Sequence, residues 1–304
     1  MRRIAAGEER RRALRLAGAL ANGSLCSRFV PRRQIDSRAA DPTPGALTGG
    51  TLRLCLPSRR RGLIDLDPHL RALERADLVR ALQRHALAEA AREAASWPTH
   101  VCVAVDLLPL AAADGAALEA AQEALAATGL AAERLVLQID EGELVTGGLA
   151  LRAALAAIGA AGVGLALRGF GETFGALGLP RDLPISALIL DRTMLRAELG
   201  ATAGTTPFDG APRGATPRGA TPRGTAPEGS RTDSDIQRTA VAADLIIARA
   251  AAALGRGAGL AVVADGIETA GEFARAAAHG IDFAQGPWIG PPMAPDAFVA
   301  AIEG

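Results

Sequence analysis

The chain has 304 residues, 49% of them hydrophobic, and its 33 basic and 33 acidic residues give a formal net charge of zero. This length and apolar content predict a folded protein with a substantial core. The balanced charge creates no overall field that would favour nucleic acid or an anionic membrane, so neither is expected as a partner. All 33 basic residues are arginine, which leaves no lysine for chemistry at any site.

The N-terminal residues, the most apolar window and the three cysteines indicate where the protein is located and whether it has a zinc site or disulfides. Residues 1–13 are rich in arginine and predict a flexible basic segment, not a signal peptide. The most apolar window, at 153–167, is shorter than the ~20 residues that cross a bilayer. Cys26, Cys55 and Cys102 form no CxxC pair, so neither a zinc site nor a disulfide framework is expected. We therefore expect a cytoplasmic protein.

Apolar segments of strand length alternate with alanine-rich helical segments along the chain. Strands are expected, in chain order, at Leu25–Val30, Leu52–Leu56, Val101–Val105, Leu135–Ile139, Val163–Leu167, Ala187–Leu190, Leu260–Ala264 and Ile281–Ala284. Helices are expected at Leu70–Ala95, Ala116–Ala127, Leu149–Ala160, Ala240–Leu254 and Ala270–Ala278. Repeated βα units predict a parallel sheet with covered faces. About eight strands favour a closed TIM-like (β/α)8 barrel of the α/β class over an open doubly wound sheet.

Residues 203–231 interrupt this pattern. They are rich in Gly, Pro, Thr and Arg and repeat the pentapeptide Gly-Ala-Thr-Pro-Arg. Such a composition cannot bury enough apolar surface to order itself. We predict a disordered low-complexity insertion within a single barrel domain at 14–304. It is expected to be a surface loop, and the alternative is a tether for an acidic partner.

Several motifs in order carry a family resemblance. The strand before Asp265 runs into Ala-Asp-Gly-Ile-Glu-Thr, and the last expected strand runs into Gln285-Gly286. Earlier segments are Phe29-Val30-Pro31 and Gly-Gly-Thr-Leu-Arg-Leu, which contains Arg53. Together they resemble bacterial EAL domains, hydrolases of the second messenger cyclic di-GMP. In that family the corresponding segments read Ala-Glu-Gly-Val-Glu-Thr, Gln-Gly, Tyr-Gln-Pro and Glu-Ala-Leu-Leu-Arg-Trp. The resemblance implies a bacterial signalling protein.

The resemblance also implies which positions face the site at the barrel mouth. Family residue types, or close equivalents, are kept at Arg53, Asp106, Glu141, Asp265, Glu268 and Gln285. Asp106 stands for a metal-binding asparagine and could still hold a cation. Four positions that carry acidic metal ligands in the family are here Gly49, Gln138, Arg168 and Gly169. Ile189 stands where the family has a lysine near the attacking water.

These changes alter what the implied site could do. A hard divalent cation requires several oxygen ligands, and Arg168 would place a permanent positive charge among them. We therefore expect Mg²⁺ and Mn²⁺ binding to be lost, no cofactor to be needed and the chain not to be an enzyme. We expect Arg168 to form an ion-pair cluster in the former pocket with carboxylates among Asp106, Asp140, Glu141 and Asp265. The alternative is that it points into solvent.

The preferred functional interpretation is a catalytically inactive EAL-domain protein that acts in signalling or regulation through an unknown protein partner. A first alternative is an active metal-dependent phosphodiesterase with ligands drawn from Asp106, Asp140, Asp265 and Glu268. A second is a metal-independent receptor for cyclic di-GMP. Arg53 could meet a phosphate, but Val30 replaces a nucleotide-contacting glutamine, which argues against retained binding. The resemblance allows a homodimer.

Overall fold

A computed structural model describes residues 13–36, 42–58, 62–66, 76–112, 114–170, 183–195, 246 and 248–304. The predicted insertion at 203–231 and nearly all of the predicted basic segment at 1–13 lie outside these residues. Residues 70–75 of the helix expected at Leu70–Ala95 lie outside them too. Of the helix expected at Ala240–Leu254, the structure describes residue 246 and the residues from 248 onward.

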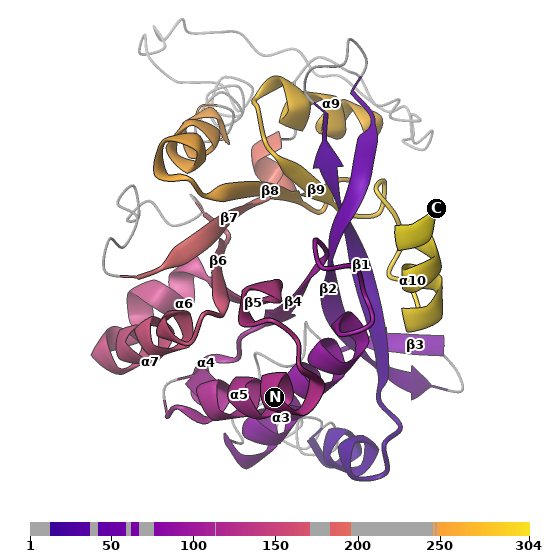
Figure 1. Cartoon of the computed structure of the whole chain (residues 1–304), viewed down its shortest axis with the longest axis vertical. Helices are drawn as coiled ribbons and strands as arrows, with labels where there is room; N and C mark the ends of the chain where they lie inside the picture. The colour runs from indigo at the N-terminus through magenta and orange to yellow at the C-terminus, as the bar shows by residue number, and fades with distance from the viewer. Residues whose placement is uncertain are drawn as a thin grey trace, which may run out of the picture.

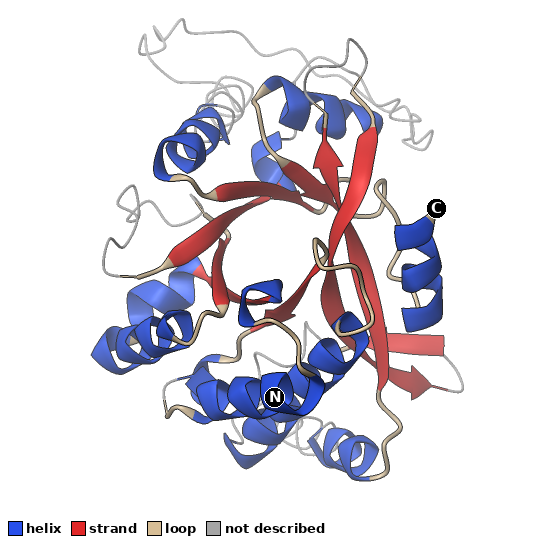
Figure 2. Cartoon of the chain, in the orientation of Figure 1, coloured by secondary structure: helices blue, strands red, loops and turns tan. Residues whose placement is uncertain are grey.

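Eight strands close into a barrel, drawn end-on as a red ring in Figure 2. Around the ring they follow the order β1, β9, β8, β7, β6, β5, β4, β2, and pairing of β1 with β2 closes it. Their bounds are β1 Cys26–Ile35, β2 Pro44–Ser58, β4 Cys102–Asp106, β5 Leu135–Asp140, β6 Gly164–Arg168, β7 Ile185–Asp191, β8 Ala261–Asp265 and β9 Phe283–Gln285. The short β3, Gly62–Asp65, pairs with β2 outside the ring. The TIM-like barrel is confirmed.

One strand runs against the others. β1 pairs antiparallel with both β2 and β9, whereas the remaining ring pairs are parallel. The connection from Ile35 to Pro44 is too short for the crossover that a parallel pair requires. An antiparallel first pair follows from that connection length.

Helices surround the barrel, as Figure 1 shows. They are α3 Ala76–Ala94, α4 Pro109–Ala112, α5 Ala116–Thr128, α6 Glu141–Thr146, α7 Gly148–Ala160, α9 Ala270–Ala278 and α10 Pro295–Glu303. The expected helices at Ala116–Ala127, Leu149–Ala160 and Ala270–Ala278 are confirmed within a residue. The main hydrophobic core lies between these helices and the sheet, and a small cluster that includes Ala166, Ile189 and Val263 fills part of the barrel interior.

β2 extends beyond the expected Leu52–Leu56 at both ends, and its added first part contains Gly49 and Gly50. A Cβ at Gly50 would come 2.5 Å from the Phe298 ring of α10, outside the barrel. A Cβ at Gly49 would come 2.5 Å from a guanidinium nitrogen of Arg32. The glycines therefore admit large side chains from β1 and α10 on the two faces of one strand. In the sequence alone they read as a strand break.

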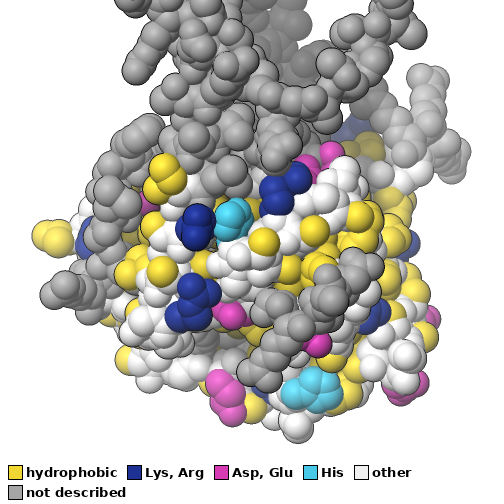
Figure 3. All heavy atoms as spheres, turned by 90° about the horizontal axis from the view of Figure 1, so that it is seen from above, with side chains coloured by type: hydrophobic (Ala, Val, Ile, Leu, Met, Phe, Trp, Pro, Cys, Tyr) yellow, Lys and Arg dark blue, Asp and Glu magenta, His cyan; other side chains and the backbone are white. Residues whose placement is uncertain are grey.

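The described surface does not carry a block of one charge on the face that Figure 3 shows. Arginine and acidic side chains are scattered there among hydrophobic and uncharged ones. This agrees with the formal net charge of zero. Within the described part of the chain, no helix is long and apolar enough to cross a membrane.

Candidate functional site at the barrel mouth

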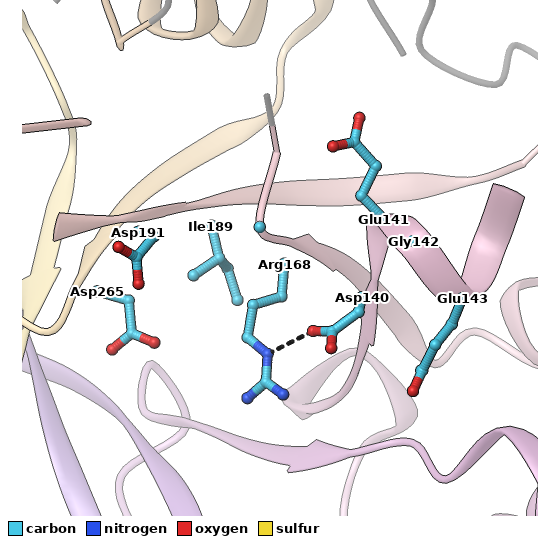
Figure 4. A pocket seen from close by; sticks show the side chains of 9 residues that line it. Asp140, Glu141, Gly142, Glu143, Arg168, Ile189, Asp191 and Asp265 are labelled. Carbon is cyan, nitrogen blue, oxygen red and sulfur yellow. Dashed lines mark hydrogen bonds and ion pairs between the residues drawn. The ribbon is translucent and has the colours of Figure 1, made fainter. Parts of the chain in front are cut away.

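A cavity of about 490 Å³ opens where the parallel strands end at their carboxyl termini. Its wall is mainly charged, as the close view in Figure 4 shows. The lining residues are Asp140, Glu141, Gly142, Glu143, Arg168, Gly169, Ile189, Asp191 and Asp265. Several strand ends thus supply polar groups to one cavity, as the barrel architecture predicts.

Arg168, the last residue of β6, lies among the carboxylates of two neighbouring strand ends. Its Nε donates to Asp140 at 2.8 Å, and its Nη1 donates to both oxygens of Asp106 at 3.0 and 3.1 Å. The Arg168 side chain is 19% exposed. The expected ion-pair cluster is therefore present with two of the four anticipated partners. Among the described residues no ion pair joins Arg168 to Glu141 or Asp265, so those two contacts were wrongly anticipated.

Arg53 joins the cluster from β2. Its Nη1 donates to Asp106 at 3.2 Å, so this aspartate accepts from two arginines. The β2–β4 register pairs Thr51 with Ala104, which brings Arg53 level with Asp106 at the ends of two parallel strands. Two guanidinium groups, those of Arg53 and Arg168, therefore pair with the carboxylates of Asp106 and Asp140 at the mouth.

A chain of side-chain hydrogen bonds crosses the barrel interior beneath the cavity. Gln285 Nε2 donates to Asp265 Oδ1 at 2.9 Å, and the Thr51 hydroxyl donates to Gln285 Oε1 at 3.1 Å. Gln138 Nε2 donates to Thr51 Oγ1 at 3.5 Å. Buried polar groups require such partners. Gln138, Thr51, Gln285 and Asp265 are therefore part of a connected interior network that joins four strands, β5, β2, β9 and β8.

Of the other predicted site residues, some line the cavity and some lie away from it. Glu141 is 2% exposed and begins α6 at the cavity wall. Ile189 and Gly169 line the cavity, and Gly169 has a φ of 69°, in the left-handed region that favours glycine. Gly49 of β2 pairs with Cys102 at the amino end of β4 and does not line the cavity. Glu268 is exposed ahead of α9 and does not line the cavity either.

The fold disfavours ionisation of Asp265, which ends β8 at the cavity wall. Desolvation raises its pKa above the ordinary aspartate value, and the charge of Asp191 acts in the same direction. The hydrogen bond from Gln285 and the charge of Arg53 act against this shift. The pKa is raised overall, so Asp265 holds its proton to a higher pH than an exposed aspartate.

Three residues with polar side chains were missed as site residues in this region: Asp191, Glu143 and Thr51. Asp191 ends β7 as Asp265 ends β8, and the two are directly paired in the sheet. A rule that every acid at a strand end faces the mouth would have found Asp191. Glu143 reaches the cavity from within α6, and Thr51 contributes only through its partners. Neither carries a signal in sequence.

The mouth does not fit the divalent cation that the resemblance implies. Asp106, the matched position that could still ligate it, and the neighbouring Asp140 already bind the guanidinium of Arg168, which carries a permanent positive charge. Among the described residues no group of three or more His, Cys, Asp or Glu side chains could hold a metal ion. Of the alternative ligand set, Asp140 and Asp265 line the cavity, whereas Glu268 does not.

Most of the chain matches the model of one protein family. The model of the EAL domain family matches residues 13–205. This chain belongs to the EAL domain family. The barrel described above is the scaffold of that family, and the mouth cavity lies at the strand ends where the motifs of the resemblance occur.

Two curated relatives of this EAL domain come from bacteria. An uncharacterized protein of Sinorhizobium fredii is 26% identical over 95% of the chain, and an uncharacterized signaling protein of Caulobacter vibrioides is 28% identical over 59% of it. The chain spans 29% and 22% of the lengths of these two proteins. They extend well beyond the region that this EAL domain matches.

Solved structures of the same fold include EAL domains with a bound dinucleotide. A structure described as the PaMucR phosphodiesterase in complex with c-di-GMP has a TM-score of 0.70 and 23% identity, covering 93% of this chain and 97% of its own. The Xanthomonas citri FimX EAL domain in complex with c-diGMP has a TM-score of 0.68 and 19% identity, with coverages of 95% and 96%. At these identities the likeness establishes the shared fold.

These findings correct one expectation. The altered residues at Gly49, Gln138, Arg168, Gly169 and Ile189 led us to expect that the chain is not an enzyme. The family match and the phosphodiesterase among the similar structures contradict that expectation. The chain is an EAL domain related to c-di-GMP phosphodiesterases, and residue types at matched positions are not evidence of lost activity.

Proposed function

We propose that this EAL domain is a receptor for cyclic di-GMP, which it binds at the barrel mouth without a metal ion and reports to a protein partner. The observation that carries the proposal is the cavity of about 490 Å³ with the guanidinium of Arg168 in its wall. The dinucleotide bound in similar EAL structures motivates the choice of ligand.

The arginines offer a means of holding a phosphodiester. Arg168 uses Nε for Asp140 and Nη1 for Asp106, and its Nη2 donates to no described residue. A charge-assisted hydrogen bond from this nitrogen suits a phosphate oxygen. Because Asp106 and Asp140 are each neutralised by a guanidinium, and the raised pKa of Asp265 favours its uncharged form, an anionic ligand meets less repulsion than the acidic lining suggests.

Position 30 bears on how the ligand would be recognised. Val30 supplies no polar side chain where the family's Tyr-Gln-Pro segment has a glutamine. Recognition by this domain therefore rests more on phosphate contacts than on base contacts. Phosphate contacts position a nucleotide but do not read its bases, so we expect weak discrimination among cyclic dinucleotides.

The first turns of α6 and α7 suggest how binding is reported. α6 starts with the cavity residues Glu141 and Glu143 and continues to Val145, which is 56% exposed. Leu149, at the start of α7, is 86% exposed. Apolar side chains exposed next to a ligand-binding element are suited to a protein contact. The partner on this surface is either another protein or a second copy of the domain.

The proposal is tested by calorimetric titration of cyclic di-GMP into the full chain, once with EDTA and once with Mg²⁺. We expect equal affinity under both conditions. Arg168→Gln should weaken binding about tenfold or more, because it removes one charge-assisted hydrogen bond. Arg84→Gln is the control, since Arg84 pairs with Glu123 on the helical surface. The absence of binding at about 1 mM dinucleotide would refute the proposal.

Hydrolysis is the second candidate, because a similar structure is a phosphodiesterase. Chromatography of the same mixtures after incubation with Mg²⁺ or Mn²⁺ would detect the linear dinucleotide. Turnover that is lost in Asp265→Ala would make the domain a phosphodiesterase and replace the receptor proposal. Turnover that persists in Asp265→Ala would point to a contaminating enzyme.

A further inference from the structure

Arg32 points into the barrel interior near the amino end of β4, away from the mouth. It is paired with Gly49 across β1 and β2, and Gly49 is paired with Cys102, the first residue of β4. Residues two apart on a strand face the same side, and the Thr51 side chain bonds within the interior. Gly49 therefore faces inward, and Arg32 beside it does so too.

The guanidinium of Arg32 occupies space that Gly49 leaves open. A Cβ at position 49 would lie 2.5 Å from Nη2 and 2.9 Å from Cζ of Arg32. The Arg32 Cζ also lies 5.6 Å from the centroid of the Phe283 ring, in a cation–π contact. The backbone and one aromatic ring thus hold the charged group in place.

Within the part of the chain that the structure describes, the Arg32 charge has no acidic counterpart. Among the described residues, no carboxylate forms an ion pair with Arg32, and its buried Nε has no hydrogen-bond partner. Burial lowers the pKa of Arg32, while the nearby Cys102 raises it. The interior arginines Arg53, Arg134 and Arg168 differ, since each donates to carboxylates or backbone carbonyls. A desolvated cation without an anion is unfavourable.

We propose that Arg32 and Cys102 form an anion site inside the barrel, where the Arg32 guanidinium binds a small oxyanion or a carboxylate. A guanidinium presents parallel N–H donors that match two oxygens of such a group. Arg32 and Cys102 each keep part of their surface exposed, whereas the Nε of Arg32 is buried, so the anion would meet the terminal nitrogens of the guanidinium. The site is distinct from the mouth cavity, whose lining includes neither residue.

Protection of the Cys102 thiol tests this site. In the 304-residue chain carrying Cys26→Ser and Cys55→Ser, Cys102 is the only thiol, and its alkylation by uncharged iodoacetamide can be followed by mass spectrometry. Inorganic phosphate, sulfate and acetate are titrated separately at constant ionic strength. We expect saturable protection, about tenfold when the anion is at ten times its dissociation constant. Phosphate and sulfate acting without acetate would identify an oxyanion site, and the reverse a carboxylate site.

Two variants separate binding from general salt effects. Arg32→Gln should abolish the protection. The neighbouring Arg33→Gln should retain it, because Arg33 donates to the Gly45 carbonyl instead. Equal protection in Arg32→Gln, or an alkylation rate in the parent that no anion changes, would overturn the proposal; the latter result would mean that the Cys102 sulfur itself compensates the arginine. If Arg32→Gln does not fold, Arg32→Lys replaces it, and weakened protection is expected.

Discussion

At the scale of residues, the sequence predicts the position of Asp265 and the charge of Arg168, but not the carboxylates that Arg168 binds. The strand-end position of Asp265 was readable, because acids that follow apolar runs in a βα repeat gather at one edge. The positive charge of Arg168 was readable as well. Its choice of Asp106 and Asp140 over Glu141 and Asp265 was not, because it depends on which strand ends lie within reach of one guanidinium.

The raised pKa of Asp265 makes a prediction about pH. A carboxyl whose pKa is higher in the folded than in the unfolded chain stabilises the fold below the unfolded pKa, and this contribution is lost as pH rises through the folded pKa. Asp265→Asn keeps an oxygen that can accept the Gln285 hydrogen bond and removes the titration. We therefore expect the unfolding free energy of the parent, relative to Asp265→Asn, to fall as pH rises from about 4.

Urea unfolding at a series of pH values measures this difference. Asp114→Asn is the control, because the pKa of Asp114 is lowered by its hydrogen bonds with Ala116 and Arg80. The stability that Asp114 contributes should be present above the unfolded pKa and lost as pH falls through the folded pKa, the opposite sign. Parallel pH profiles for the parent and Asp265→Asn would contradict the prediction.

At the scale of elements, α9 has the best-defined start. The Thr269 hydroxyl accepts from the Glu272 backbone N–H at 3.2 Å, and the Glu272 carboxylate accepts from the Thr269 N–H at 3.2 Å. This capping box satisfies N–H groups that have no partner within the helix. The expected bounds of this helix came from its alanine-rich pattern, and the capping box fixes its start in the structure.

Thr269→Ala should lower the unfolding free energy by about 1 kcal/mol, because the first turn of α9 loses its side-chain acceptor. Thr269→Ser retains the hydroxyl and should lie close to the parent. Denaturant unfolding of the three proteins provides the comparison. A Thr269→Ser protein as unstable as Thr269→Ala would assign the loss to the methyl group and not to the cap.

At the scale of the whole molecule, an aromatic cluster connects distant parts of the chain. The Phe298 ring of α10 lies 5.4 Å from Phe29 of β1 and 4.7 Å from Trp97, which follows α3. Phe29 and Trp97 are 5.0 Å apart in an edge-to-face contact. Phe29 and Phe298 are fully buried. α10 is therefore packed against the strand that closes the barrel.

Phe298→Ala should destabilise the protein by about 3–5 kcal/mol, because it leaves a cavity beside two aromatic rings. Phe298→Leu fills more of that space and should be less destabilising. Thermal and denaturant unfolding would measure both. A loss below about 1 kcal/mol for Phe298→Ala would mean that α10 is not coupled to barrel stability.

The sequence by itself determined the order of strands and helices, the barrel class and the family, because these follow from local periodicity and from motifs that are contiguous in the chain. It also identified most of the residues at the mouth. Only the tertiary structure decided that Arg168 binds Asp106 and Asp140, that Gly49 makes room for Arg32, and that Phe298 meets Phe29. Those contacts join residues far apart in sequence, so they are settled only when the sheet closes and its register places them together.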